Sequence, residues 1–407
     1  MTLVIVIFAL VYLGMLLGRL PRLQLDRTGV ALLGAIALVA SGRLSLDDAV
    51  AAVDIGTLAL LFALMVVSAQ LRLGGFYTRV TLALTSMDLS PPAFLGALVL
   101  VVGALSAVFS NDVICLAVTP VLLEACARRG LDPVPFLLAL ACAANVGSAA
   151  TLIGNPQNML IGQALDLSFS GYLLAATPVC VLGLAAVWAV IAQQTQGRWY
   201  SRTNIPVSSV ALPSFNAWQT GKGLLVVALL LWAFLFESWP RELVALTGAG
   251  WLLMSRRMHS RDMLALVDWQ LLVLFAGLFV VNDAFQRTEL PSQIVDALEV
   301  AGIHIAHPAS LFAIIVVLSN AVSNVPAVML LLPFSGHELA GMILALASTF
   351  AGNLLIVGSI ANIIVIDSAA RGGVPIDWRR HARTGVPVTL ATLALAAATL
   401  WVLSSIR

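Results

Sequence analysis

Long apolar runs follow one another along the whole chain, and they constrain its fold more than any other feature. Charged or turn residues separate the runs, which fall at residues 2–18, 28–41, 53–70, 92–124, 134–165, 172–193, 222–236, 242–254, 267–285, 308–334, 341–366 and 385–404. A bilayer core of about 30 Å requires roughly 20 apolar residues per helical span. The chain is 60% hydrophobic and only 10% charged, far less charged than a soluble domain. We therefore predict an all-α polytopic membrane protein.

Several function classes have no support in the residues. Nucleic acid is not an expected partner, because the chain has a single lysine, Lys222, and no basic patch. The cysteines lie in or beside apolar segments without metal-ligand spacing, and we expect them to pack in the core. No nucleophile–base set or phosphate loop is visible, so neither an enzyme nor a cofactor is expected. The histidines are expected in loops, at His259, His304, His307, His337 and His381.

The basic residues predict an orientation in the membrane. If the runs 92–124 and 308–334 enter and leave on one side as re-entrant hairpins, most arginines share one face. That face would hold Arg19, Arg22, Arg27, Arg72, Arg79, Arg128, Arg129, Arg198, Arg202, Lys222, Arg256, Arg257, Arg261, Arg371, Arg379, Arg380 and Arg383. Only Arg43, Arg241, Arg287 and Arg407 fall opposite. We therefore expect a cell (inner) membrane protein with its N-terminus outside.

An internal repeat divides the chain into two halves. VALLGAIALVASGR from Val30 aligns without gaps onto VALTGAGWLLMSRR from Val244, an offset of 214 that also superimposes Asp54 on Asp268. Further on, Ser110-Asn111-x8-Pro120 matches Ser323-Asn324-x8-Pro333 at an offset of 213. Finally, Gly154-x3-Asn158 matches Gly358-x3-Asn362 at an offset of 204. Four blocks in one order indicate a duplicated unit.

When the apolar runs are traced through the membrane in order, the two copies cross it in opposite directions. We therefore predict inverted repeats. Each copy has about five spanning helices plus one re-entrant hairpin, with broken helices at the midplane. The predicted first repeat is 1–193, with a hairpin at 92–124 and a broken helix at 134–165. A cytoplasmic linker is predicted at 194–221. The predicted second repeat is 222–407, with a hairpin at 308–334 and a broken helix at 341–366. Inverted repeats place a transport site at their shared interface.

Polar residues in the middle of the hairpin runs are the first candidate site. A hairpin tip exposes helix ends beside side-chain oxygens, so it can bind a cation, an anion or both. The candidates are Ser110, Asn111 and Asp112 in the first tip and Ser319, Asn320, Ser323 and Asn324 in the second. Helix capping is the alternative, because Ser, Asn and Asp cap helices elsewhere. The recurrence of Ser-Asn in both halves favours the binding site.

The broken helices are the second candidate site. Pro156 removes a helical hydrogen bond and, with Gly147 and Gly154, predicts a break at membrane depth, where irregular backbone survives only if protein or a cavity covers it. The candidates are Asn145, Gly147, Ser148, Thr151, Asn155 and Asn158 in the first half and Thr349, Asn353, Ser359 and Asn362 in the second. Small residues at helix contacts are the alternative. That alternative explains the glycines but not so many amides.

Asp112 is the one acid expected at membrane depth. An intramembrane carboxylate is costly, so by default it indicates function. Asp112 could bind sodium, carry a proton or cap the second arm of its hairpin. Its repeat counterpart is Val325, which indicates that the fold does not need an acid there. Candidate sodium ligands are Ser110, Asn111, Asp112, Asn145, Ser323 and Asn324.

At these motifs the chain resembles the ion transporter superfamily, over nearly its whole length. Ser110-Asn111-Asp112 with Thr119-Pro120 resembles the Asn-Asp…Thr-Pro segment of arsenite permeases. Asn145 to Asn158 resembles the broken-helix signature shared by arsenite permeases and D-type sodium/proton antiporters. The divalent-anion symporters carry Ser-Asn-Thr at both tips, whereas this chain has Asp112 and Val325, which counts against dicarboxylate binding in that manner. The resemblance implies elevator-like motion and frequent dimerisation.

The preferred expectation is a secondary active transporter for a small inorganic or organic anion or oxyanion, coupled to sodium or protons. A sodium/proton antiporter and an arsenite efflux permease remain open. A receptor that kept the fold would need damaged motifs, and both sets are intact. Substrate, coupling ion, stoichiometry, direction and oligomeric state are left undetermined by the sequence.

Overall fold

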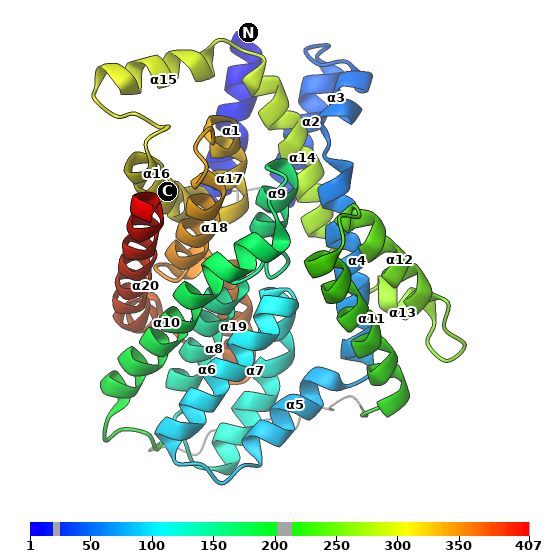
Figure 1. Cartoon of the computed structure of the whole chain (residues 1–407), viewed down its shortest axis with the longest axis vertical. Coiled ribbons are helices and arrows are strands. Elements are labelled where there is room, and N and C mark those ends of the chain that lie inside the picture. Colours follow the sequence, from blue (N-terminus) through cyan, green and yellow to red (C-terminus); the bar gives the residue numbers. More distant parts are fainter. Residues whose placement is uncertain (19–24, 202–213, 407) are drawn as a thin grey trace.

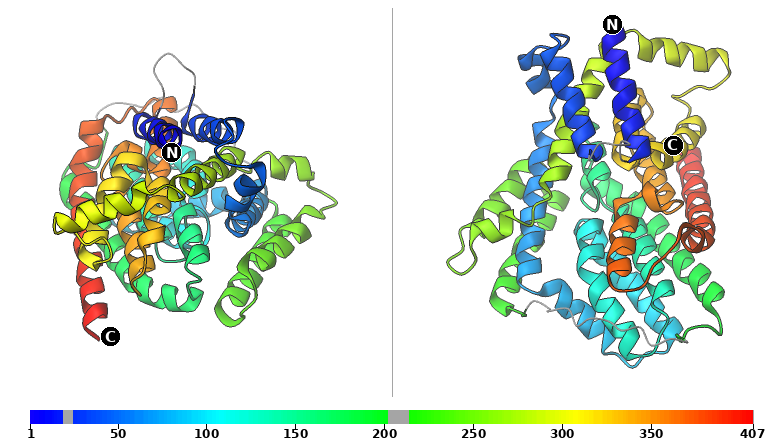
Figure 2. Two further views of the ribbon diagram at one scale, coloured as in Figure 1. Left: turned by 90° about the horizontal axis from the view of Figure 1, so that it is seen from above. Right: turned by 180° about the vertical axis from the view of Figure 1, so that it is seen from behind.

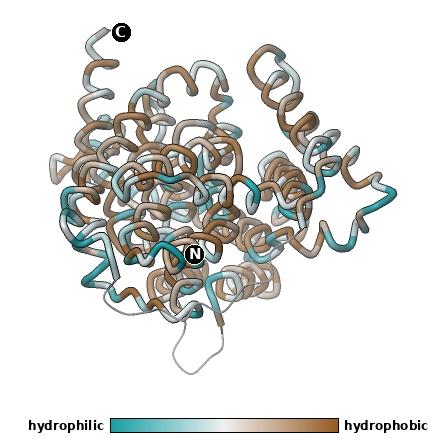
Figure 3. The backbone as a smooth tube through the Cα atoms, turned by 90° about the horizontal axis from the view of Figure 1, so that it is seen from below, coloured by the Kyte–Doolittle hydropathy of each residue, from teal (hydrophilic) through white to brown (hydrophobic). Residues whose placement is uncertain are grey.

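The computed structural model is all-α in the parts of the chain that it describes, residues 1–18, 25–201 and 214–406. Six of the described helices are long and apolar enough to cross a membrane, and hydrophobic colour dominates the helices in Figure 3. The expected all-α polytopic fold is therefore confirmed. Arg19, Arg22, Arg202 and Arg407, together with linker residues 202–213, lie outside the described residues.

The first half of the chain contains ten helices among its described residues (Figure 1). They are α1 (Thr2–Leu17), α2 (Arg27–Ala40), α3 (Leu46–Ala52), α4 (Ile55–Leu73), α5 (Phe76–Thr85), α6 (Pro91–Val108), α7 (Asn111–Arg128), α8 (Pro133–Ser148), α9 (Pro156–Ala164) and α10 (Phe169–Thr195). The short α3 and α5 fall outside the apolar runs. They connect spans at the two ends of the molecule.

The described residues of the second half of the chain also form helices. Its elements are α11 (Ala217–Phe236), α12 (Arg241–Leu253), α13 (Ser260–Leu264), α14 (Trp269–Gln286), α15 (Leu290–Val300), α16 (Pro308–Val322), α17 (Asn324–Leu331), η1 (Leu332–Phe334), α18 (Ala340–Ala351), η2 (Ile356–Gly358), α19 (Ile360–Arg371) and α20 (Trp378–Ile406). Helix α15 lies across the upper end of Figure 1. Its sequence is amphipathic rather than continuously apolar, which is why no run predicted it.

Two helical pairs turn back in mid-molecule. Helix α6 ends at Val108 and α7 starts at Asn111, and this pair occupies the lower half of Figure 1. Helices α16 and α17 meet at Ser323 in the upper half. Ser323 has φ 80°, a left-handed conformation that costs energy for a residue with a side chain. Such strain at a tip is typical of functional positions.

Two further helices are interrupted at similar depth. Helix α8 ends at Ser148, and α9 begins at Pro156, whose missing N–H suits the first helical position. Asn155 caps α9 by accepting a hydrogen bond from the Asn158 backbone N–H at 2.8 Å. In the second half, helical structure stops at Ala351 and α19 resumes at Ile360, with the short η2 between.

The helices that match in the repeat pack reciprocally across the two halves. Helix α2 packs against α14, and α12 packs against α4, while Asp54 and Asp268, 214 residues apart, cap α4 and α14 in the same way. Helices α4, α11 and α12 form a wall on one side, and α6 to α8, α10 and α16 to α20 form a compact group on the other (Figure 2). The second helix of each repeat thus packs against the fourth helix of the other, α2 on α14 and α12 on α4, which supports a two-fold relation between the two halves of the chain. The inversion of the halves, their boundaries and the membrane orientation stay predictions.

Candidate functional site

The first hairpin tip touches the broken helix of its own half. The backbone N–H of Asn111 donates to the Gly154 carbonyl at 3.2 Å, which joins the start of α7 to the segment between α8 and α9. The Thr151 hydroxyl donates to the Ala107 carbonyl at the end of α6. The hairpin and the break are therefore one structural unit.

Asn145 on α8 connects this unit to the second half of the chain. Its amide oxygen accepts from Asn111 Nδ2 at 3.1 Å and from the Ser359 hydroxyl at 2.9 Å. Its amide nitrogen donates to Asn353 Oδ1 at 2.8 Å and to Asn362 Oδ1 at 3.2 Å. The side chain is almost completely buried, and both its donors and both acceptor positions are used. Asn145 is thus the centre of a polar network in an apolar surrounding.

Thr349 on α18 forms a second centre. Its hydroxyl accepts from Gln157 Nε2 at 3.1 Å and from Asn155 Nδ2 at 3.4 Å. Asn155 Nδ2 also donates to the Ser148 hydroxyl at 3.0 Å. The amide of Asn324 joins this centre when its nitrogen faces the carbonyls of Ser348 and Gly358, each at 3.1 Å, and its oxygen accepts from Gln157. The Ser319 hydroxyl contacts the Asn324 amide and donates a hydrogen bond to the Ser348 carbonyl at 3.0 Å.

The contacts of the two centres correspond at the repeat offset of 204. Asn145 corresponds to Thr349, and Asn155 corresponds to Ser359. Asn155 and Ser359 each directly precede the helix that follows the break in their own half, and each donates a hydrogen bond to the centre that lies in the other half. Asn158 and Asn362 also correspond. Asn158 donates to the Thr151 carbonyl at 2.9 Å, and Asn362 donates to the matching Leu355 carbonyl at 3.1 Å. The same amide therefore stabilises each break.

Two glycines allow the backbones to approach. A Cβ on Gly147 would lie 2.3 Å from the Gly103 carbonyl oxygen on α6, and one on Gly154 would lie 2.2 Å from the Ser148 carbonyl oxygen. Real Cβ atoms do not approach backbone so closely. The small-residue helix contact that was the alternative for Gly147 is thus present, and it coexists with the amide network.

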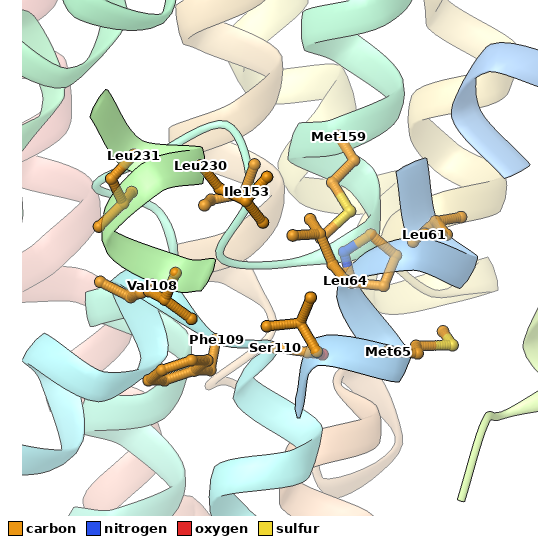
Figure 4. Close-up of a pocket in the computed structure, with 13 residues that line it drawn as sticks. Leu61, Leu64, Met65, Val108, Phe109, Ser110, Ile153, Met159, Leu230 and Leu231 are labelled. Atoms are coloured by element: carbon orange, nitrogen blue, oxygen red, sulfur yellow. The ribbon is translucent and has the colours of Figure 1, made fainter. Parts of the chain in front are cut away.

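Other predicted site residues lie outside the network. Asn320 donates to the Val316 carbonyl on its own helix. Ser110 lines a cavity of about 20 Å³ between the first hairpin tip and the wall formed by α4 and α11 (Figure 4). The other labelled side chains there are apolar, among them Leu64 and Leu231. Asp112, in the first turn of α7, is half-buried and makes no hydrogen bond or ion pair with any described residue.

Several buried oxygens in this region have no hydrogen-bond partner among the described residues. They are Asn111 Oδ1, Asn158 Oδ1, Asn320 Oδ1 and Ser106 Oγ. Leaving a buried polar atom unpaired costs about 1–3 kcal/mol, so a ligand that pairs with such atoms would be stabilised by them. Carbonyl and hydroxyl oxygens are suitable ligands for a hard cation. At the two hairpins, Asn111 Oδ1 and Asn320 Oδ1 are thus oxygens of the kind that bind a hard cation, and the hydrogen bonds of the two centres involve no charged side chain among the described residues.

His381 corrects the expectation that all five histidines lie in loops. It lies inside α20, only 1% exposed, with its Nε2–H directed at the Asn353 carbonyl at 3.1 Å. The carbonyl can only accept, so the proton is assigned to Nε2. The error arose because the apolar run begins at 385, whereas the helix begins seven residues earlier. Gln157 was also missed as a site residue, although it follows directly on Pro156.

We expect His381 to position the Asn353 loop rather than bind a ligand. His381→Ala should lower the transport rate about tenfold, because it leaves the buried Asn353 carbonyl unpaired. His381→Gln retains an N–H donor of similar reach and should restore most of the rate. Flux in proteoliposomes containing either variant measures this difference. Equal loss in both variants would contradict the positioning role.

Comparisons with known proteins identify the family. The family model described as citrate transporter (CitMHS) matches residues 3–337. The silicon efflux transporter LSI3 of Oryza sativa subsp. japonica is 29% identical, covering 96% of this chain and 95% of that protein. A transporter of Mycobacterium tuberculosis is 31% identical over 93% of this chain and 94% of its own length. The YdaH transporter of Alcanivorax borkumensis has the same fold, with a TM-score of 0.60, 14% identity and coverage of 98% and 96%.

Proposed function

The chain belongs to the CitMHS citrate transporter family within the ion transporter superfamily, and on that premise we propose that it moves a small anion or oxyanion coupled to sodium or protons. It is a multi-pass membrane transporter. The single observation that carries the proposal is the amide and hydroxyl network around Asn145 and Thr349, which reaches both broken helices and the first hairpin directly and the second hairpin through Gln157 and Asn324. We propose that one half-site comprises Asn111, Asn145 and Ser148 of the network, with Ser110 beside Asn111, and that the other comprises Asn324, Thr349 and Asn353, with Ser323 beside Asn324.

The chemistry of these groups suits an ion without a fixed counter-charge in the protein. Helices α7, α9, α17 and α19 all begin in this region, and helix N-termini attract negative charge. Unpaired side-chain oxygens such as Asn111 Oδ1 suit a cation. An anion and a co-bound cation could therefore neutralise each other there. Many secondary transporters combine broken helices with ion binding in this way.

Asp112 is the proposed coupling residue, because it offers a carboxylate close to the first hairpin tip. Asp112→Asn should abolish concentrative uptake while leaving downhill exchange within about threefold, since an amide cannot exchange a proton or balance a cation. Substrate accumulation with and without an imposed sodium or pH gradient measures this. Glu124→Gln, on the same helix but paired with Arg128 near its other end, is the matched control. Gradient-driven accumulation by Asp112→Asn would contradict the coupling role.

A second candidate is efflux of a neutral hydroxylated acid such as arsenous acid. The side chains of the two centres are amides and hydroxyls, which suits a solute that is neutral at pH 7. The relative LSI3 is named as a silicon efflux transporter, and silicic acid is likewise a neutral hydroxylated acid. The third candidate is a sodium/proton antiporter that uses Asp112 alone.

One experiment separates the three candidates. Internal pH and solute are followed in proteoliposomes while sodium, arsenite, silicate and citrate are offered in turn. Proton movement evoked by sodium alone supports the antiporter. Solute or proton movement that occurs only with citrate, or only with a neutral acid, identifies that substrate class. Asn111→Ala and Asn324→Ala should each reduce the observed flux. Unchanged flux in both correctly inserted variants would refute the proposed binding site.

We further propose an inner-membrane location with the N-terminus outside and a homodimeric state. The orientation is supported by Arg72, Arg128 and Arg371 in the last turns of α4, α7 and α19, against Arg43 and Arg287 at the opposite ends of spans. Cysteine labelling from each side of the membrane tests the orientation.

A further inference from the structure

A groove with a basic rim lies where the start of α8, the end of α10 and the start of α20 meet. These three helices pack against one another, and the groove has a volume of about 420 Å³. Its rim carries Arg198, Arg380 and Arg383, and its apolar lining includes the half-buried Pro135 above the buried side chains of Leu138 and Ile191. The groove therefore combines positive charge with an apolar base.

The described residues that line the groove do not balance its positive charge. Arg380 forms an ion pair with Asp132 at 3.1 Å. Neither Arg198 nor Arg383 forms an ion pair within the part of the chain that the structure describes. Three arginines and one aspartate leave a local formal charge of +2. A ligand with negative charge would complement it.

The backbone around the rim is held in place by specific contacts. Gln194 Nε2 on α10 donates to the Arg383 carbonyl on α20 at 2.8 Å, and the Thr384 hydroxyl donates to Gln194 Oε1 at 2.8 Å. The backbone N–H of Asp132 donates to the Trp199 carbonyl at 2.9 Å, which fixes the segment after α10. The rim is thus preorganised for binding.

Exposed aromatic side chains indicate the level of the membrane interface. Trp378 at the start of α20 and Tyr200 after α10 are each 66% exposed. The guanidinium of Arg379 lies over the Trp378 ring, 5.3 Å from the ring centroid. Exposed Trp and Tyr beside arginines are typical of the headgroup region, where they anchor spanning helices. Trp378, Tyr200 and the arginines therefore favour a position of the groove at the level of the lipid phosphates.

We propose that this groove binds an anionic phospholipid, with its phosphate held by Arg198 and Arg383 and the start of an acyl chain passing over Pro135. The accessible apolar surface at Pro135 favours a lipid over a free phosphate ion, because the ion gains nothing from it. Basic pockets between spanning helices bind anionic headgroups in this way. The lipid would also stabilise the first turn of α20, next to His381 and its contact with Asn353.

Native mass spectrometry of the purified full chain tests this site independently of transport. The protein is equilibrated with mixed micelles of phosphatidylglycerol and phosphatidylcholine, and retained lipid is counted. Wild type should retain phosphatidylglycerol selectively. Each arginine contributes roughly fivefold near a surface, so Arg198→Gln/Arg383→Gln should retain it about 30-fold less tightly. Arg379→Gln, a neighbour on α20 that does not line the groove, is the matched control and should bind as wild type does.

The outcomes distinguish a bound phospholipid from a free anion and from non-specific binding. Equal retention by the double variant and wild type would overturn the proposal, as would equal loss in the Arg379→Gln control. Displacement of the lipid by millimolar inorganic phosphate would assign the groove to a free anion instead. If the double variant fails to fold, the two single variants suffice, with about a fivefold loss expected in each.

Discussion

Asn145→Ala is expected to abolish transport, with the rate falling about 100-fold. The substitution removes all four hydrogen bonds that join Asn111, Ser359, Asn353 and Asn362 through one side chain. Two or more buried amides then lose a partner, at about 1–3 kcal/mol each, and a difference of about 3 kcal/mol corresponds to roughly 100-fold. The two halves of the site would no longer be held in register.

The measurement is initial flux in proteoliposomes together with the melting temperature of the purified protein. Gln70→Ala is the matched control. Gln70 is also a buried amide with two hydrogen bonds, at 3.0 and 2.8 Å, but these go to Gln219 and join α4 to α11 away from the breaks. We expect the control to lose stability while retaining most of its flux. Equal flux in the two variants would show that Asn145 has only a structural role.

Gly147→Ala is expected to destabilise the protein by about 3 kcal/mol and to abolish transport. The new Cβ would lie 2.3 Å from the Gly103 carbonyl oxygen and 2.4 Å from its Cα, so α8 and α6 would have to separate. Overpacking of this kind costs about 1–3 kcal/mol or more, and here the obstacle is backbone, which cannot rotate away. The displaced α8 would also carry Asn145 and Ser148 out of position.

Gly250→Ala supplies the control for this substitution. Gly250 lies within α12, and a Cβ there would meet no atom within 4 Å. Alanine favours a helix over glycine by about 1 kcal/mol, so this variant should be as stable as wild type or slightly more so. Thermal unfolding in detergent and flux after reconstitution measure both variants. A Gly147→Ala protein as stable and active as Gly250→Ala would contradict the close contact.

The candidate site could be predicted in outline because membrane burial makes polar residues conspicuous. Asn111, Asn145, Asn324 and Asn353 stood out in apolar runs, where an amide without a partner is costly, and the tertiary structure places all four within the network. Ser110 and Asp112 stood out for the same reason. A sequence pattern cannot tell whether a side chain at the end of a helix faces inward or toward a neighbouring wall, and these two lie outside the network.

The all-helical membrane fold could be predicted from the sequence alone, and the division into two inverted halves stays a prediction from the same residues. Apolar runs must become helices in a bilayer, since only helices and closed barrels satisfy their own backbone there, and the duplicated blocks match at offsets of 214, 213 and 204. The identity of the polar groups that meet came from the packing of the helices. Asn145 and Asn362 are 217 residues apart, and His381 reaches Asn353 from a helix that begins before its apolar run. Such pairings depend on how helices pack, and local periodicity carries no information about a partner 200 residues away.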